Sequence, residues 1–249
     1  EITDLIGSYT TNFASSSAGR AKNVITGVSK VDGTILYPGE EFDLAKTVSP
    51  FTQENGYELA GAYQNGTVVE SFGGGICQVA TTLYNAVIRA ELEITMRFNH
   101  SMLVHYVEPS MDAAIAGNYK DLKFKNNLDA PVYIEGYCSG GIIYFNVYGK
   151  ETRPSNREIS FESETVSKTD PKVQFTMDAS LTAGSVSVTQ SGQSGCIAQL
   201  WKIVKVDGKQ QSRDLFNKSN YQATPKLITI GTKDATSETL SALKAAITI

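Results

Sequence analysis

Apolar residues recur with helical spacing in the middle of the chain. In residues 78–90, QVATTLYNAVIRA, they fall every three or four positions. This spacing places them on one face of an α-helix that packs against a core. Small and apolar residues are mixed in a similar way over residues 21–31. We therefore expect a helix at 78–90 and a shorter helix at 21–31.

Strict alternation of apolar and polar residues predicts strands after the first of these helices. Leu92, Ile94, Met96 and Phe98 alternate with polar neighbours, which is typical of a half-buried strand. Further strands are expected in the segments LVHYVEP, DLKFKNN, APVYIEGYC and GIIYFNVYG, the last two joined by a Ser-Gly-Gly hairpin turn. The first part of the chain is thus expected to have an α+β fold, with a buried helix that starts at Cys77.

Turn signals complete the outline of this first domain. Pro38-Gly39 separates two apolar pieces within residues 35–44, which predicts two short strands joined by a turn. Residues 1–20 are rich in Ser, Thr and Gly and are interpreted as an entry segment. After residue 149 the sequence becomes charged and polar, KETRPSNRE, and we place a domain boundary near residue 153.

A second, smaller domain is expected at residues 154–233. Strand-like runs alternate there with Gly-containing turns, and Asp207-Gly208 has the chemistry of a hairpin turn. This predicts an all-β module. Residues 234–249 form a tail, DATSETLSALKAAITI, in which a short amphipathic helix is expected.

Composition excludes several classes of partner. The chain has 249 residues, of which 41% are hydrophobic and 19% charged, and a formal net charge of -4. Without a basic stripe it offers no field for a phosphate backbone, so nucleic acid is not an expected partner. No run approaches the roughly 20 apolar residues that cross a bilayer. Attachment to a membrane would need a segment that precedes Glu1.

The three cysteines are far apart and do not form a C-x-x-C motif. A zinc knuckle or a dithiol redox site is therefore not expected, and neither a metal nor an organic cofactor is required. Because the count is odd, at least one thiol stays free. Cys138 and Cys196 are interpreted as small buried hydrophobic residues.

Cys77 differs from the other two because it follows three glycines and precedes the expected helix. A thiol at a helix start lies near the positive end of the helix dipole, which favours the thiolate. The amides of Cys77 and Gln78 could also stabilise the oxyanion of an acyl-transfer intermediate. Gly74, Gly75 and Gln78 are expected to contact the substrate. A phosphate-binding loop is the alternative, but the G-K-[ST] ending is missing.

A cysteine nucleophile usually needs a base, and the chain contains two histidines, His100 and His105. If residues 92–106 form one strand, the two imidazoles point to opposite faces, so that one of them meets Cys77. His100 then shares the face of Met96 and Phe98. A structural role for either histidine is the alternative, and the residues alone do not decide between an enzyme and a non-catalytic protein.

The sequence also resembles a known family over about residues 5–150. The stretch SFGGGICQVATTLYNAVIRAELEITMRFNHSMLVHYVEPSMDAAIAG, together with RAKNVITGVSKVDGTILYPGEEFDL, is similar to the VanW-like domain family. Carried onto this chain, the GGGICQ cysteine of the family is Cys77 and the NHS histidine is His100. Asp112 and Asp121 match family positions, as carboxylates that either orient the histidine or cap turns.

The resemblance implies an extracytoplasmic cell-wall enzyme of Gram-positive bacteria. Some VanW-domain proteins are L,D-transpeptidases, which join two peptidoglycan stem peptides through their third residues. Stem peptides would then be the partners. Arg97 could bind a substrate carboxylate or decorate the solvent face of its strand, and we favour the solvent face. A cysteine-dependent peptidase or amidase and a non-catalytic wall-binding protein are the alternatives.

Residues 160–233, which end in PKLITIGTK, resemble the extracellular G-five β module. In that family the module is associated with binding of wall glycans or with acting as a spacer. Trp201 is the single tryptophan of the chain, and we interpret it as a core residue rather than a sugar-stacking platform.

Overall fold

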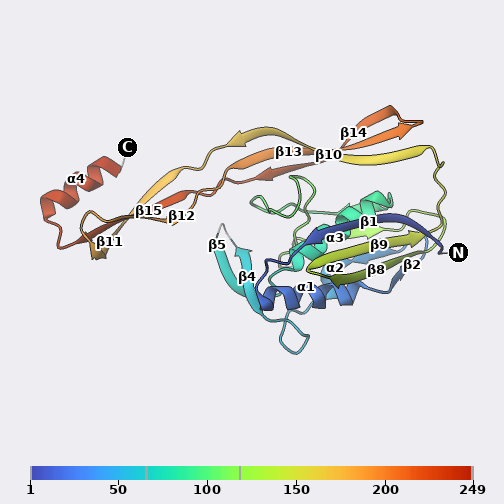
Figure 1. Cartoon of the computed structure of the whole chain (residues 1–249), viewed down its shortest axis with the longest axis horizontal. Helices are drawn as coiled ribbons and strands as arrows, with labels where there is room; N and C mark the ends of the chain where they lie inside the picture. Colours follow the sequence, from blue (N-terminus) through green and yellow to red (C-terminus); the bar gives the residue numbers. More distant parts are fainter. Residues whose placement is uncertain (1, 65–66, 118, 248–249) are drawn as a thin grey trace. The chain divides into compact units, whose positions relative to one another are not determined.

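The structure is a computed structural model that describes residues 2–64, 67–117 and 119–247. It contains two compact units. Unit 1 comprises Glu1–Thr165 and Ala198–Ser219, and unit 2 comprises Val166–Ile197 and Asn220–Ile249. The strands of the sheets are labelled in Figure 1.

A four-stranded antiparallel sheet with two helices on one face forms the centre of unit 1 (Figure 1). Its strand order is β1-β9-β8-β2, with β1 at Asp4–Asn12, β9 at Ile142–Gly149, β8 at Val132–Ser139 and β2 at Thr34–Leu36. The helix α1 (Ala18–Val31) packs on β8, and α3 (Ile76–Arg89) packs on β1 and β9. The expected hairpin is confirmed, since β8 and β9 pair up to Ser139 and Ile142.

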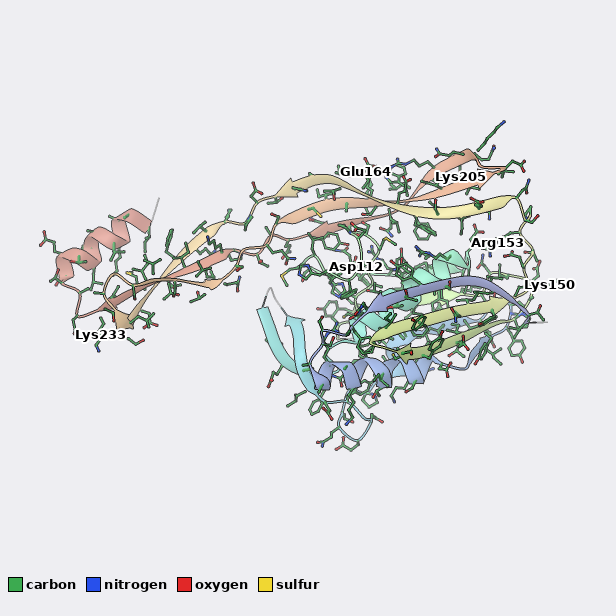
Figure 2. All side chains as sticks on the ribbon, viewed as in Figure 1. Asp112, Lys150, Arg153, Glu164, Lys205 and Lys233 are labelled. Atoms are coloured by element: carbon green, nitrogen blue, oxygen red, sulfur yellow. The ribbon has the colours of Figure 1, made fainter. Side chains whose placement is uncertain are left out.

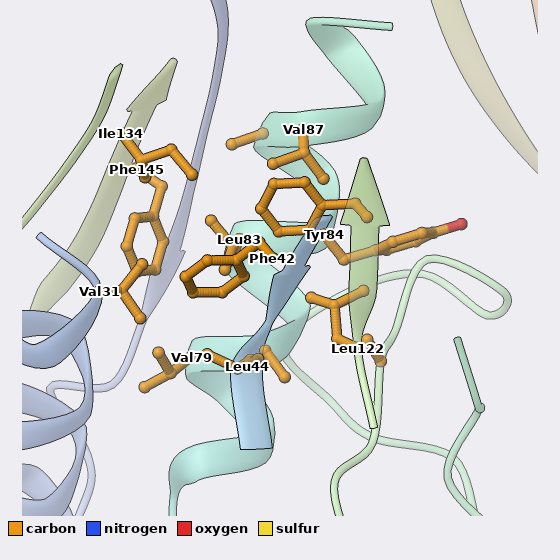
Figure 3. Packing of buried hydrophobic residues seen from close by; sticks show 14 of the residues in the cluster. Val31, Phe42, Leu44, Val79, Leu83, Tyr84, Val87, Leu122, Ile134 and Phe145 are labelled. Atoms are coloured by element: carbon orange, nitrogen blue, oxygen red, sulfur yellow. The ribbon is translucent and has the colours of Figure 1, made fainter. Parts of the chain in front are cut away.

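The helix α3 is the buried centre of unit 1. Twelve of its fourteen residues are buried, so it is covered on nearly all sides rather than along one face. Figure 3 shows Val79, Leu83 and Val87 of α3 surrounded by other core side chains, among them Phe145 of β9. Helices are present at both expected places. They begin at Ile76 and at Ala18, earlier than the sequence suggested, and Ile76 also precedes Cys77, at which the buried helix was expected to start.

Two smaller sheets complete the N-terminal part of unit 1. One has the order β3-β7-β6, with β3 at Glu41–Asp43, β7 at Lys123–Lys125 and β6 at Glu93–Met96, and the short helix α2 (Leu44–Val48) follows β3. The other is a hairpin of β4 (Leu59–Gln64) and β5 (Thr67–Phe72), which leads into the glycine loop. The two strands expected beside Pro38-Gly39 exist as β2 and β3, but they join different sheets.

Part of the expected second domain belongs to unit 1. The strands β10 (Arg157–Thr169), β13 (Gly195–Val206) and β14 (Lys209–Tyr221) form a sheet in the order β10-β13-β14. Leu200 is a member of the unit 1 core, and Phe161 and Phe216 pack against that core. The compact units therefore differ from the division expected at residue 153, because apolar side chains beyond that position share the core.

Unit 2 contains a single-layered sheet of β11 (Val173–Thr182), β15 (Lys226–Lys233) and β12 (Val186–Gln190). The strand β15 lies in the middle, parallel to β11 and antiparallel to β12. Most side chains of β11 and β12 are exposed, and Figure 2 shows them projecting from both sides of the ribbon. The Asp207-Gly208 hairpin turn between β13 and β14 is confirmed, with positive φ at both residues.

The tail forms the helix α4 (Ser237–Ile247), and none of its described residues is buried. Residues 248–249 of the expected tail lie outside the described residues. Within the described part of the chain, every helix falls short of the length and apolar character needed to cross a membrane.

Two of the expectations from the sequence were wrong. Residues 97–109 were expected to continue β6 and to form another strand, but β6 ends at Met96 and the following loop is irregular. Backbone groups of this loop bond to a later part of the same loop: the Phe98 carbonyl accepts from the Ala114 amide at 2.8 Å, and the His100 amide donates to the Asp112 carboxylate at 2.7 Å. The Ser/Thr-rich start contains β1, which lies beside β9 at the edge of the central sheet.

An ion cluster around Glu91 joins the end of α3 to β10 and β13 inside unit 1. The Glu91 carboxylate accepts two hydrogen bonds from Arg157, at 2.6 and 2.9 Å, and one from Lys202. Arg153, labelled in Figure 2, lies 3.6 Å away. Burial alone would raise the pKa of Glu91, but the hydrogen bonds from Arg157 and Lys202 lower it to about 2.

We predict that Glu91→Gln destabilises unit 1 at neutral pH by about 1–3 kcal/mol, because three cations lose their carboxylate. The folded pKa lies below the ordinary 4.5, so this contribution is present above pH 4.5 and is lost as the pH falls towards 2. Urea unfolding at pH 7 and pH 3, followed by the fluorescence of Trp201, measures it.

The matched control is Glu93→Gln, since Glu93 is exposed. The deficit of Glu91→Gln should shrink at pH 3, while the control follows the wild type at both pH values. An equal deficit at both pH values would contradict this account of the cluster.

Candidate active site

Three side chains at successive turns of α3 hold an extended segment of the long loop, residues 111–115. Four helical residues rise about 6 Å, close to the roughly 6.6 Å covered by two residues of extended chain. Successive members of the series Cys77, Thr81 and Asn85 can therefore contact alternate residues of that segment. The contacts are Asn85 Nδ2 to Met111 O at 2.6 Å, Thr81 Oγ1 to Ala113 N and O at 3.0 and 3.1 Å, and Cys77 Sγ to Ile115 N and O at 3.5 and 3.4 Å.

The glycine loop lets the start of α3 approach its neighbours closely. A Cβ on Gly74 would lie 2.8 Å from the carbonyl oxygens of Ala60 and Gly61 in β4. Gly75 is the N-cap of α3, has a φ of 114° and packs against α1. Two of the three glycines thus fix the position of Cys77 between β4 and α1, in addition to bordering the cavity described below.

The Cys77 thiol forms a hydrogen bond with the imidazole of His100. On its other side, His100 Nδ1 lies 2.6 Å from Asp112 Oδ2, and the His100 amide donates to the same oxygen at 2.7 Å. Because Nδ1 faces Asp112, Nε2 is the ring nitrogen that remains for the thiol. The three residues have the order of a nucleophile, a base and an orienting carboxylate.

Arg97 extends this chain of polar contacts, because it binds the carboxylate oxygen of Asp112 that His100 does not contact. Its Nη2 donates to Asp112 Oδ1 at 2.9 Å, and its Nε donates to the Asp112 carbonyl at 2.7 Å. The Arg97 side chain is 7% exposed and that of Asp112 is 1% exposed. Both roles considered for Arg97, substrate binding and solvent exposure, are therefore wrong, because the guanidinium is consumed by a buried ion pair.

The charges of these groups shift their pKa values together. Burial would raise the pKa of Cys77, but the hydrogen bond and positive charge of His100 hold it below its ordinary value. Burial would lower the pKa of His100, yet Asp112 and Cys77 raise it to about 9. The pKa of Asp112 is lowered despite burial, by His100 and Arg97. The positive charge of His100 therefore favours the thiolate of Cys77, and the thiolate in turn favours the imidazolium.

His105 does not join this group. Its side chain is exposed and lies outside the cavity that Cys77 and His100 line. The parity argument for choosing His100 is also wrong, because residues 97–106 do not form a strand; two bonds to the Asp112 carboxylate position His100 instead. Asp121 takes the capping role, since it accepts from the Ala45 amide of α2 at 2.9 Å.

The start of α3 offers one amide for an oxyanion. The Gln78 amide donates to Gly75 O at 2.9 Å, so it is engaged, whereas the Cys77 amide has no hydrogen-bond partner among the described residues. The expectation of two donors from these residues is therefore corrected to the Cys77 amide. The Gln78 side chain is buried and bonds to Thr11, Asn12 and Arg20, so it supports the loop from behind.

The thiol lies in the wall of a cavity of about 520 Å³. Its walls include the glycine loop, the first turn of α3, Arg20 of α1, the loop residues 100–104 and Tyr106. Burial raises the pKa of Tyr106 well above its ordinary value, so its hydroxyl, which is hydrogen-bonded to Thr81, stays protonated. Arg20 and Lys120 also line the cavity.

The other candidate chemistry is weaker. Cys138 is half-buried and burial raises its pKa to about 11; burial also raises the pKa of Cys196. Within the described residues, His, Cys, Asp and Glu side chains do not gather into a group that could hold a metal ion. Trp201 is half-buried, with the guanidinium of Arg213 4.1 Å from its ring centroid, so one ring face is already occupied.

Sequence reasoning missed Thr81, Asn85, Tyr106 and Arg20. For the first two a signal existed, because Cys77, Thr81 and Asn85 recur at four-residue spacing inside an apolar helix. Polar residues on a buried helix face must find partners, which points to a structured segment beside them. The other two have no comparable local pattern.

This arrangement defines a protein with a cysteine, histidine and aspartate site on an α+β scaffold. Residues 19–148 match the family model described as VanW like protein, so the chain belongs to the VanW-like family. Residues 161–233 match the G5 domain, which identifies the β-rich part. Together the two families indicate a cell-wall-associated protein outside the cytoplasm, and G5 domains are associated with cell-wall or glycan partners.

Two curated relatives agree with this assignment. The chain is 35% identical to the uncharacterized protein YoaR of Bacillus subtilis over 60% of this chain and 49% of YoaR. It is 26% identical to the vancomycin B-type resistance protein VanW of Enterococcus faecalis over 45% of this chain and 42% of VanW. The chain thus spans about half the length, or less, of these relatives.

Among solved structures, the G5 domain of IgA1 protease is 26% identical over 31% of this chain and 94% of that domain, with a TM-score of 0.21. At this TM-score the G5 assignment depends on the family model alone.

We predict that Cys77 is the fastest of the three thiols to react with iodoacetamide at pH 7, because it alone has a lowered pKa. His100→Ala should slow its labelling about tenfold or more, which corresponds to a loss of one pKa unit of thiolate stabilisation. Mass spectrometry of the labelled peptides measures the three rates.

The matched control is His105→Ala, which should label like the wild type because His105 is exposed. Faster labelling of Cys138 or Cys196 in the folded protein, or equal effects of the two histidine variants, would be incompatible with the assignment.

Proposed function

We propose that the chain is a cysteine-dependent L,D-transpeptidase that joins two peptidoglycan stem peptides through their third residues. The observation that carries the proposal is the hydrogen-bonded set of Cys77, His100 and Asp112 in the wall of a cavity. Membership of the VanW-like family supports the same reading. A binding protein would gain nothing from a lowered thiol pKa at a cavity wall.

In the first half of the reaction the Cys77 thiolate attacks the carbonyl between the third and fourth residues of a donor stem. The Cys77 amide stabilises the oxyanion that forms. His100, already protonated at neutral pH, gives its proton to the departing amine as the C–N bond breaks. The products are a thioester on Cys77, a neutral imidazole and a free D-amino acid.

In the second half the side-chain amine of an acceptor stem attacks the thioester carbonyl. The neutral His100 accepts the proton of this amine, the C–S bond breaks, and Cys77 leaves as a thiolate. The new amide joins the two stems, and the thiolate–imidazolium pair is restored. Asp112 stays ionised throughout, since Arg97 and the imidazolium compensate its charge.

A cavity of this size suits a peptide substrate. Pockets of about 300–1,000 Å³ bind small ligands, and a short stem peptide falls in that range. The half-buried Phe51 and the exposed Phe72 line the cavity as well, and they give an acyl chain apolar contacts. Partial enclosure of the thioester slows competing hydrolysis, which a transferase requires.

We predict that tetrapeptide stems with a free side-chain amine yield a dimer joined through the third residues, with release of the terminal D-residue. Mass spectrometry should count dimer against shortened tripeptide. Cys77→Ala is the blank, and Cys138→Ala is the control that keeps activity, because Cys138 lies outside the cavity lining.

Tripeptide as the sole product across a wide range of acceptor concentrations would replace the transferase by a hydrolase. Absence of any adduct on Cys77 would leave a non-catalytic wall-binding protein.

We predict that acylation, measured as kcat/KM for the donor, falls as the pH rises through about 9, because His100 then loses the proton that the leaving amine needs. Asp112→Asn removes a carboxylate that raises the pKa of His100, so the alkaline limit should move to lower pH. At pH 8 its kcat/KM should drop about tenfold or more for each unit by which the limit moves below that pH.

The control is Asp121→Asn, which removes the other family-matching carboxylate, one that caps α2. Its alkaline limit should stay at that of the wild type. An unchanged limit in Asp112→Asn would separate Asp112 from the proton transfer.

A further inference from the structure

The cavity has two cations that no protein carboxylate neutralises. Arg20 enters it from α1 and Lys120 from the end of the long loop, and both are half-buried. Among the described residues neither has an ion-pair partner; Lys120 donates to the Asn99 carbonyl at 3.1 Å. The described residues that line the cavity include no aspartate or glutamate.

Elsewhere in the site the charges balance. Arg97 forms an ion pair with Asp112, and His100 lies between the Asp112 carboxylate and the Cys77 thiol, both of which raise its pKa. The positive charges of Arg20 and Lys120 are not compensated by a carboxylate of the described residues. They lie in a partly enclosed space, where charge interactions are stronger than in bulk water. A ligand that fills this cavity is therefore expected to be an anion.

Arg20 is the better fixed of the two cations. Its Nη1 donates to Ser16 Oγ at 2.6 Å and its Nη2 to Gln78 Oε1 at 2.8 Å. Gln78 is the residue after Cys77, and its amide nitrogen Nε2 is held by Thr11 and Asn12. These bonds hold the guanidinium next to the first turn of α3, while its remaining N–H groups stay available to a planar acceptor.

We propose that Arg20 is a specificity-determining residue that binds a carboxylate of the donor peptide beside the carbonyl attacked by Cys77. The inference rests on the proposed function for the identity of the peptide, but the anion subsite itself does not. Two carboxylates of a donor could fill it: that of the departing terminal residue, whose carbon is two bonds from the leaving nitrogen, or that of a third-residue side chain. The terminal carboxylate is the one every such donor carries.

The test of the subsite uses alkylation of Cys77, which needs no turnover. Iodoacetate and iodoacetamide form the same Sγ–C bond with loss of iodide, but only iodoacetate is an anion. The ratio of their rates on Cys77 cancels any change in thiolate fraction or folding. At low ionic strength we expect Arg20→Gln to lower the iodoacetate-to-iodoacetamide ratio about threefold or more.

Two variants sharpen the measurement. Arg20→Lys keeps the charge and should keep the ratio close to that of the wild type. Lys22→Gln removes an exposed cation of the same helix, one paired with Glu58, and should leave the ratio unchanged. An unchanged ratio in Arg20→Gln would overturn the subsite, as would an equal fall in Lys22→Gln.

Donor analogues then identify the carboxylate. In the wild type, amidation of the carboxylate that Arg20 binds should raise KM about tenfold or more, and Arg20→Gln should lose this discrimination. If Arg20→Gln no longer discriminates against the terminal carboxamide, Arg20 binds the terminal carboxylate. If it no longer discriminates against the third-residue carboxamide, Arg20 binds the side-chain carboxylate. Undiminished discrimination against both amides in Arg20→Gln would overturn the role in specificity.

The outcomes separate the two proposals. If no donor reacts but Arg20→Gln still lowers the alkylation ratio, the transpeptidase reading fails and the anion subsite stands. If donors are cross-linked but Arg20→Gln leaves the alkylation ratio unchanged, the anion subsite fails and the transpeptidase proposal stands.

Discussion

The match in rise between a helix and an extended chain is the constraint on which the candidate site depends. Cys77, Thr81 and Asn85 each bond to the backbone of the segment 111–115, which fixes the segment along α3. The position of Asp112 along the axis of α3 is therefore fixed. His100 takes its place through two bonds to Asp112, so that the imidazole meets the thiol without a strand to support the loop.

This order of support explains how so many polar groups can be buried beside a reactive thiol. An isolated buried carboxylate would be protonated or would destabilise the fold. Here Arg97 compensates the charge of Asp112 from one side and His100 from the other, and the guanidinium also donates to the loop backbone and to Ser219 Oγ. The same contacts that keep Asp112 ionised also raise the pKa of His100 and stabilise the thiolate. Stability of the loop and reactivity of Cys77 are thus linked through one carboxylate.

Local sequence patterns predicted those elements that depend on residues close together in the chain. Helical periodicity revealed α3, the Ser-Gly-Gly and Asp-Gly turns revealed two hairpins, and the glycine loop before a helix pointed to Cys77. The strand β1 was missed because Ser- and Thr-rich sequence is ambiguous between a strand and a loop. The role of Arg97 could not be predicted, since its partner is 15 positions away in an irregular loop. Alternation after β6 suggested a strand, but backbone groups of Phe98 and His100 bond to Ala114 and Asp112 in an irregular loop instead.

The contacts between α3 and the loop carry a consequence for how related sequences can vary. Within the segment 111–115, Met111, Ala113 and Ile115 are held through backbone groups that any amino acid other than proline supplies. Their side chains can change within the limits of packing, but the number of residues between them cannot. A single insertion there would shift the residues on one side of it by about 3.3 Å along α3, so that the contacts with Cys77, Thr81 and Asn85 could no longer all form. Gaps should therefore accumulate in residues 101–109 and stop at Ser110.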